Sequence, residues 1–213
     1  ETLLDGAIDD QDNNVRFLEK IRQHVGRLGS LVTDLLSLAR IESPAAALDA
    51  VPIDLRDVVT GAAARRADPI AARRLDVRLD LPETPVEVLG DREAMRQVVD
   101  NLLENAINYT PEGGSVWIAA GLESGDGWLR ITDTGIGIPE AALDRIFERF
   151  YRVDRGRSRE LGGTGLGLSI VRNLVTRMNG RIDVESTLAK GSVFTVVLPA
   201  AASDSVPNET RGS

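Results

Sequence analysis

The chain has 213 residues, 42% of them hydrophobic and 27% charged, which suits one ordinary domain plus an appendage or two small domains. Its net charge of −8 disfavours general nucleic-acid binding, and the absence of cysteine excludes disulfides and cysteine-based zinc sites. No apolar run approaches the roughly 20 residues of a membrane-spanning helix, so we expect no membrane contact by this chain. Because the sequence starts at Glu1 without a methionine, we interpret it as a fragment of a longer protein.

Residues 14–42 carry a heptad pattern of apolar positions, which is typical of a helix in a bundle. These positions are Leu18, Ile21, Val25, Leu28, Val32, Leu35 and Ala39. Residues 1–13 are predicted to hold the end of an earlier helix and a polar turn over 9–13, and Ser43-Pro44 ends the pattern. We therefore predict a partial helical hairpin over 1–44 and a linker over 45–50. Such a hairpin has no chemistry of its own.

After residue 50 the pattern changes to mixed helix and strand, up to about residue 199. We predict helices over 54–70, 91–109 and 166–178, with Asp91 as an N-cap. Strands are predicted over 75–81, 86–89, 115–122, 128–132, 181–185 and 192–198. The small and polar tail over 200–213 is predicted to be disordered. The fold class is therefore α+β.

The first motif that can carry chemistry is a row of three asparagines. Asn101, Asn105 and Asn108 are spaced i, i+4 and i+7, so they share one face of the predicted helix. Asparagine is a mediocre helix former, and its amide oxygen is a suitable ligand for Mg²⁺ beside substrate phosphates. The alternative is a solvated helix face with no ligand.

The second motif, Asp133-Thr-Gly135-Ile-Gly137-Ile138-Pro139, directly follows a predicted strand. Glycines let the backbone come close to a ligand, and a carboxylate at a strand end can accept a hydrogen bond from an amine such as adenine N6. A plain glycine turn is the alternative.

The third motif, Gly162-Gly163-Thr164-Gly165-Leu166-Gly167-Leu168, comes just before a predicted helix. Backbone N–H groups and the positive end of a helix form an anion site. The motif is neither a P-loop nor a strand-led dinucleotide fingerprint. A flexible linker is the alternative, although three leucines interleaved with the glycines argue against it.

The fourth motif places three aromatic residues, Phe147, Phe150 and Tyr151, before a basic stretch that contains Arg152, Arg155, Arg157 and Arg159. An aromatic anchor followed by a basic strip suits a lid over phosphates, predicted over 153–163. The alternative is a surface turn held by buried aromatic side chains.

In this order and spacing the four motifs resemble the N, G1, F and G2 boxes of the bacterial sensor histidine kinases. The resemblance covers about residues 51–199 and implies the Bergerat ATP-binding fold, a two-layer α/β sandwich with helices on one face of a mixed sheet. Residues 35–43 resemble the end of the second dimerisation helix of that family, which places the truncation within the dimerisation domain. Residues 1–7 and 159–164 are most similar to the phosphate-regulon branch.

The resemblance implies a set of ATP-binding residues. They are Asn101, Asn105, Asn108, Tyr109, Asp133, Gly135, Gly137, Ile138, Arg152, Gly163, Thr164, Gly165, Leu166 and Gly167. Within this set the resemblance implies that Asn105 is the Mg²⁺ ligand, that Tyr109 flanks the adenine and that Asp133 binds adenine N6. It also implies that Arg152 reaches the terminal phosphate. The family often has lysine in place of Asn108, so one cation beside the phosphates is in doubt.

The family phosphorylates a histidine that is followed by an acidic residue and, a few positions on, a proline. The one histidine of this chain, His24, is followed by Val-Gly-Arg-Leu. It lacks the acid that a nucleophilic imidazole needs, and it lies on the predicted second helix of the hairpin. We therefore interpret His24 as a boundary residue and expect the acceptor histidine and its acid upstream of Glu1.

The implied function is Mg-ATP binding and transfer of the γ-phosphate to a histidine outside this fragment, for relay to an aspartate of a cognate response regulator. The resemblance further implies a homodimer through the hairpin and a cytoplasmic location, as part of a membrane-anchored sensor. The alternatives are an ATPase of the gyrase or Hsp90 type and a non-catalytic nucleotide-sensing module. Those ATPases carry a water-activating Glu where this chain has Asn101, and asparagine cannot act as a base.

Overall fold

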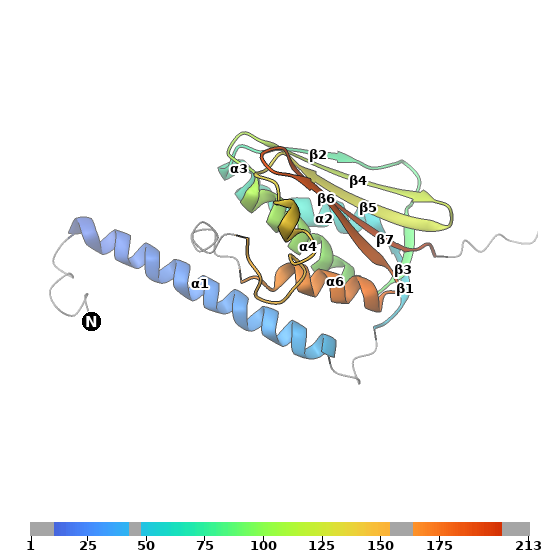
Figure 1. Cartoon of the computed structure of the whole chain (residues 1–213), viewed down its shortest axis with the longest axis horizontal. Coiled ribbons are helices and arrows are strands. Elements are labelled where there is room, and N and C mark those ends of the chain that lie inside the picture. Colours follow the sequence, from blue (N-terminus) through green and yellow to red (C-terminus); the bar gives the residue numbers. More distant parts are fainter. Residues whose placement is uncertain (1–10, 43–47, 154–163, 202–213) are drawn as a thin grey trace, which may run out of the picture.

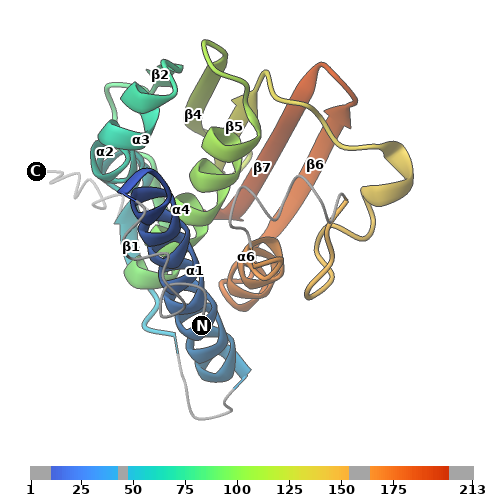
Figure 2. The same cartoon turned by 90° about the vertical axis from the view of Figure 1, so that its left-hand side faces the viewer.

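The structure is a computed structural model that describes residues 11–42, 48–153 and 164–201. Its first element is α1 (Gln11–Glu42), a single long helix that lies along the outer side of the helix layer, beside α6 (Figures 1 and 2). Residues 11–13 belong to this helix, so the polar turn predicted over 9–13 is wrong there. The first helix of the predicted hairpin and the tail from residue 202 fall outside the described residues.

A five-stranded mixed sheet forms one layer of the remaining domain, in the order β2-β4-β5-β7-β6. Its strands are β2 (Asp76–Asp80), β4 (Ser115–Glu123), β5 (Asp126–Asp133), β7 (Gly191–Pro199) and β6 (Arg181–Thr187). β2 is parallel to β4, and the other neighbours are antiparallel. A second, two-stranded sheet pairs β1 (Val51–Asp54) with β3 (Glu87–Gly90).

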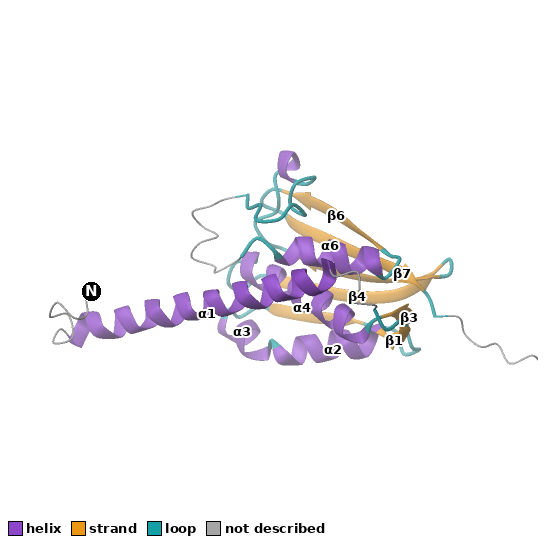
Figure 3. Ribbon diagram, turned by 90° about the horizontal axis from the view of Figure 1, so that it is seen from below, coloured by secondary structure: helices purple, strands orange, loops and turns teal. Residues whose placement is uncertain are grey.

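The helices form the second layer and cover one face of the large sheet, as Figure 3 shows from below. They are α2 (Leu55–Arg65), the short α3 (Ala67–Ala72), α4 (Arg92–Tyr109) and α6 (Gly167–Arg177). The core lies between the layers because alternate strand residues point toward the helices. In β5, for example, Leu129, Ile131 and Asp133 are buried, while Arg130 between them is exposed. The two-layer α/β sandwich expected from the sequence is thus confirmed.

Two predicted boundaries differ from the structure. The helix predicted over 54–70 is two helices, because α2 ends at Arg65 and α3 begins at Ala67, and Asp54 is the N-cap of α2. Residues 51–54 form β1, a strand that was not predicted, and its last residue, Asp54, was taken as the start of that helix. A strand this short, with Pro52 in it, has no local pattern of its own and depends on pairing with β3. Within the described part of the chain, no helix is both long and apolar enough to span a bilayer.

Candidate functional site

A cavity of about 1020 Å³ opens between α4, α6, the loop after β5 and the start of β7. Most of the residues singled out in the sequence line it: Asn101, Asn105, Asn108, Tyr109, Asp133, Gly135, Gly137, Ile138, Arg152, Thr164, Gly165 and Gly167. Gly163 falls outside the described residues. The side chain of Leu166 is fully buried in the hydrophobic core rather than in the cavity wall. Four motifs that are far apart in the sequence therefore meet at one cavity.

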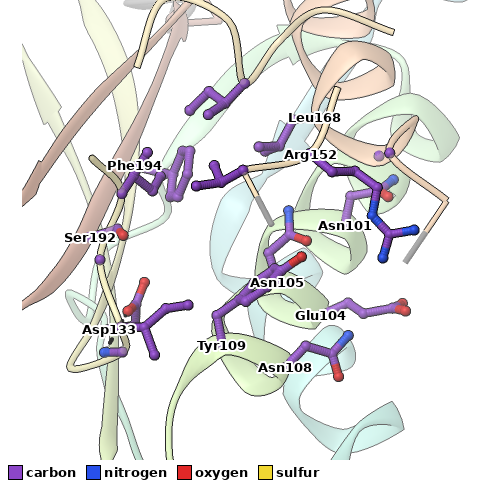
Figure 4. Close-up of a pocket in the computed structure, with 18 of the residues that line it drawn as sticks. Asn101, Glu104, Asn105, Asn108, Tyr109, Asp133, Arg152, Leu168, Ser192 and Phe194 are labelled. Carbon is purple, nitrogen blue, oxygen red and sulfur yellow. Dashed lines mark hydrogen bonds between the residues drawn. The ribbon is translucent and has the colours of Figure 1, made fainter. Parts of the chain in front are cut away.

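Helix α4 presents the asparagine row to the cavity, as Figure 4 shows. The helix starts because the Asp91 side chain caps it, with Oδ1 accepting a hydrogen bond from the Ala94 amide at 2.8 Å. Its apolar side packs into the core through Met95, Val98, Val99, Leu102, Leu103 and Ala106, all buried. With that side buried, Asn101 and Asn105 lie on the cavity side of the helix, and Asn101 lies beside the start of α6.

Asp133 lies at the end of β5 and is only 7% exposed. Its Oδ1 accepts a hydrogen bond from the Gly135 amide at 2.7 Å, and the Ser192 amide also donates to this carboxylate. Ser192 is its cross-strand partner on β7. Burial raises the pKa of Asp133, and the two amide donors offset part of that rise. The result is a carboxylate in a largely apolar wall, able to accept one more hydrogen bond from a ligand.

The loop after Asp133 is held from both sides. The Ile136 amide donates to the Tyr109 carbonyl of α4 at 3.1 Å, and the Ile138 amide donates to Ser186 Oγ of β6 at 2.8 Å. Gly137 has φ +68, and a Cβ there would lie 2.1 Å from the Thr187 carbonyl oxygen, so this position requires glycine. The loop is therefore a rigid wall of the cavity rather than a free glycine turn.

The start of α6 forms another wall, and its N-terminal end meets the cavity at Gly167. Gly165 has φ +77, and its carbonyl accepts a hydrogen bond from the Phe150 amide at 2.9 Å. The Leu166 amide donates to Thr164 Oγ1 at 3.2 Å, and the buried Leu166 side chain anchors the turn in the core. A helix N-terminus that faces a cavity through glycines favours an anionic ligand.

The aromatic motif divides its side chains between core and surface. Phe147 and Tyr151 pack against the core, with the Arg172 guanidinium 5.6 Å from the Phe147 ring centre and that of Arg145 4.4 Å from the Tyr151 ring centre. Phe150 is 61% exposed, with φ +61. The turn is thus held by two partly buried aromatics rather than fully buried ones, and it also delivers Arg152 to the cavity. The lid predicted over 153–163 lies almost wholly outside the described residues.

Figure 4 shows two chemically different ends of the cavity. Asp133 and Ser192 lie at one end, and Arg152 lies near Asn101 at the other. Thr33 is the residue of α1 that lines the cavity, whereas His24 is not among the lining residues. His24 and Thr33 are nine positions apart on α1, which is about 13 Å along the helix axis. His24 is exposed, and its Nδ1 donates to the Lys20 carbonyl at 2.7 Å.

Sequence reasoning missed several lining residues, among them Ser192, Phe194 and Glu104, and it missed Ser186 as the anchor of the glycine loop. Ser192 and Ser186 sit on strands whose sequence shows only alternation, and their role depends on β7 lying between β5 and β6. Glu104 could have been predicted from the sequence, because it lies between Asn101 and Asn105 on α4.

Comparison with known proteins identifies the family of this chain. Residues 90–202 match the family described as histidine kinase-, DNA gyrase B-, and HSP90-like ATPase. The chain is 37% identical over 199 residues to the sensor-like histidine kinase SenX3 of Mycolicibacterium smegmatis, an alignment that covers 93% of this chain and 51% of that protein. It is 37% identical over 196 residues to the phosphate regulon sensor protein PhoR of Pseudomonas aeruginosa, with 92% of this chain and 44% of that protein covered.

Among solved structures, full-length ShkA in complex with AMPPNP superposes with a TM-score of 0.74 at 29% identity, covering 91% of this chain and 40% of that one. The chain spans about half the length of the curated relatives that it matches. The matched family covers all four cavity-lining motifs and more than half of the residues. The chain therefore belongs to the histidine kinase-, DNA gyrase B-, and HSP90-like ATPase family, and its relatives within that family are sensor histidine kinases.

Proposed function

We propose that this chain binds Mg-ATP in the described cavity and, in the longer protein, delivers the γ-phosphate to a histidine outside the fragment. In that transfer the bond between the γ-phosphorus and the β,γ-bridging oxygen breaks, a phosphorus–nitrogen bond forms, and the imidazole proton passes to an adjacent acid. The observation that carries the proposal is the polarity of one cavity. It has the buried carboxylate of Asp133 at one end, and Asn101, Arg152 and the N-terminus of α6 at the other.

The carboxylate end suits adenine. The Asp133 carboxylate lines the cavity and keeps acceptor capacity beyond its two amide donors, which fits the exocyclic N6 amine, and Tyr109 is placed to flank the ring. Gly135, Gly137 and Ile138 form the wall beside that position. A base without this amine would leave the carboxylate desolvated and without its ligand hydrogen bond, so the site should discriminate against it.

The other end suits a metal-bound triphosphate. The described residues contain no group of three or more histidine, cysteine or acidic side chains that could hold a metal unaided. Magnesium usually keeps waters and phosphate oxygens and takes only one or two protein ligands, so the amide oxygen of Asn105, with Asn101 beside it, fits this metal. Phosphate oxygens would be contacted by the backbone amides of Thr164, Gly165 and Gly167. Arg152 would contact the terminal phosphate.

A hydrolytic role is disfavoured at Asn101. Its Nδ2 donates to the Gln97 carbonyl at 2.9 Å, and a Cβ on Gly167 would lie 2.8 Å from its Oδ1. This side chain is fixed against the start of α6 and has no basic atom that could activate water. The cavity is therefore better suited to holding ATP for transfer than to hydrolysing it.

The partners proposed for the longer protein follow from α1 and from the family. Six heptad residues of α1 are 46–62% exposed in the single chain: Leu18, Ile21, Val25, Leu28, Val32 and Leu35. Such an apolar row needs other helices to cover it, and we assign it to a homodimeric helical bundle. The acceptor of the relayed phosphate would be a cognate response regulator, and the kinase would be the cytoplasmic part of a membrane-anchored sensor.

Titration calorimetry with Mg-ATP and Mg-ADP tests the proposal. We expect wild type to bind in the micromolar to sub-millimolar range, and Asp133→Asn to lose about 1.5–3 kcal/mol, the usual effect of removing a charged hydrogen-bond partner. Asp126→Asn, the same change at the exposed start of β5, is the control and should bind like wild type. Equal affinities of the Asp133 variant and wild type would exclude this adenine site.

A stability measurement separates lost binding from lost folding. Because burial raises the pKa of Asp133, its charged carboxylate lowers the stability of the folded state relative to the unfolded state near neutral pH. Replacement by neutral Asn, which can still accept from the Gly135 amide, should leave the thermal midpoint of the nucleotide-free protein equal to or above that of wild type.

A further inference from the structure

The C-terminal end of α4 is a junction between the asparagine row and the loop after β5. A helix leaves its last carbonyl groups without partners inside the helix. At this end the Ala106 carbonyl accepts from the Thr110 amide at 3.0 Å. The Tyr109 carbonyl accepts from the Ile136 amide at 3.1 Å, which ties the helix to the loop that also contains Gly135. Between these two, the carbonyls of residues 107 and 108 have to find a donor from elsewhere.

That donor is Arg73, which lies between α3 and β2, far from either motif in sequence. Its Nη1 lies 3.1 Å from the Ile107 carbonyl oxygen, 3.2 Å from that of Asn108 and 3.3 Å from that of Thr110. The Arg73 carbonyl also accepts from the Gly113 amide at 3.1 Å, so its backbone is fixed to the segment that follows α4. The half-buried guanidinium thus places a positive charge at the negative end of the helix dipole.

We propose that Arg73 is a positioning residue for the nucleotide, an inference that rests on the proposed ATP site. The turn that Arg73 caps carries Asn108 and Tyr109, and it follows directly on Asn105. The same turn holds the adenine-side loop through the Tyr109 carbonyl. Without the guanidinium the last turn would fray, because the carbonyls of Ile107 and Asn108 would lose their donor. Tyr109 and Ile136 would then shift together, although Arg73 is not among the residues that line the cavity.

The neighbouring Arg74 provides a matched control. It has the same side chain one position later, but it forms an ion pair with Glu112, and its side chain is 80% exposed. An exposed pair of this kind contributes little to stability. Arg73→Gln and Arg74→Gln remove the same charge from adjacent positions, so a difference between them reports on the α4 cap and not on net charge.

The experiment measures Mg-ATP affinity and amide hydrogen exchange for wild type, Arg73→Gln, Arg73→Lys and Arg74→Gln. We expect Arg73→Gln to weaken binding about tenfold, which is the scale of losing a charged hydrogen-bond donor. Arg74→Gln should stay within about twofold of wild type. Arg73→Lys should recover part of the loss, because an ammonium group can still donate to helix carbonyls as a point charge.

Hydrogen exchange without nucleotide separates positioning from general destabilisation. In Arg73→Gln the amides of Thr110 and Ile136 should exchange faster, while the amide of Ile131 in the centre of β5 keeps its wild-type rate. Faster exchange at Ile131 to the same degree would mean that Arg73 serves only global stability, and it would overturn the proposal. Equal losses of affinity in Arg73→Gln and Arg74→Gln would also overturn it, as would an unchanged affinity in Arg73→Gln. A wild-type chain that binds no ATP would overturn the proposed function itself, and with it this inference.

Discussion

At the scale of single residues, the asparagine row presents neutral amides to the cavity in which we propose that ATP binds. The resemblance to the sensor histidine kinases implies that lysine is common in place of Asn108, and the asparagine row offers oxygen atoms and N–H donors without net charge. Much of the electrostatic attraction for a triphosphate would then have to come from the bound metal, from Arg152 and from the N-terminus of α6. Binding should therefore depend strongly on the metal ion.

Asn105→Ala tests this dependence. Removing the proposed metal ligand should weaken ATP binding about ten- to a hundredfold when Mg²⁺ is present, since a charge-assisted contact is lost. With EDTA in place of Mg²⁺ the same substitution should change the affinity much less. Titrations of both proteins under both conditions give the comparison, and a loss of the same size with and without the metal would show that Asn105 is not a metal ligand.

At the scale of elements, the position of α4 depends on a small polar cluster at the start of α2. Asp54 Oδ1 accepts from the Arg56 amide at 3.0 Å and from the Val86 amide at 3.2 Å. Its Oδ2 pairs with the Arg56 guanidinium at 2.7 Å. One carboxylate thus caps α2 and joins it to the residue before β3. Because α2 packs against α4, this cap supports the helix that carries the asparagine row.

The Asp54 cap makes a prediction about pH. The hydrogen bond with the Arg56 side chain is the main reason why the pKa of Asp54 is lowered in the folded protein. A carboxyl group whose folded pKa lies below its unfolded pKa stabilises the fold above the unfolded value, and this contribution is lost as pH falls through the folded value. Asp54→Ala should therefore cost about 1–2 kcal/mol of unfolding free energy near pH 7.

The difference between Asp54→Ala and wild type should shrink once the pH falls below about 4, where the unfolded carboxyl becomes protonated. Urea unfolding of both proteins at pH 7 and at pH 3 measures this. Asp54→Asn, which keeps a capping oxygen but not the charge, should lie between wild type and Asp54→Ala at pH 7. A stability difference that stays constant with pH would contradict a charge-dependent cap.

At the scale of the whole molecule, α1 presents an apolar surface and the α/β domain presents the cavity. The heptad row on α1 is exposed, and Thr33 brings the helix to the rim of the cavity. His24 is exposed and lies about two and a half turns before Thr33, so it is not at that rim. An imidazole that lacks an adjacent acid and lies away from the ATP site does not meet the needs of a phosphate acceptor.

We therefore predict that this chain, incubated alone with Mg-ATP, gains no acid-labile phosphate on His24. A longer protein that includes an upstream histidine followed by an acid should label, and this labelling should survive His24→Ala. Radiolabelled ATP with acid and base treatment of the product distinguishes phosphohistidine from phosphoester. Labelling of the present fragment that disappears in His24→Ala would require α1 to be reinterpreted as the acceptor helix.

The positions of several helices and strands are determined by local sequence alone. The Asp91 cap and the apolar spacing from Met95 predicted α4, and alternation together with glycine turns predicted β4, β5 and β7 to within a few residues. Motif chemistry suggested Asp133, Asn105 and the glycine loops as separate candidates, since carboxylate, amide and backbone N–H groups suit different parts of a nucleotide. The resemblance to the sensor histidine kinases then joined them into one predicted ATP site. Patterns of this kind depend on residues within one or two turns of each other, so they are visible without the fold.

Tertiary structure decided the contacts between distant segments. Only the order of strands in the sheet puts the Ser192 amide against Asp133, and only the packing of the α3–β2 connection against α4 brings the Arg73 guanidinium to carbonyls 34–37 positions away. The short strand β1 likewise exists because β3 pairs with it. Backbone hydrogen bonds are chemically the same at every residue, so the sequence does not encode which distant donor meets which acceptor until the core has packed.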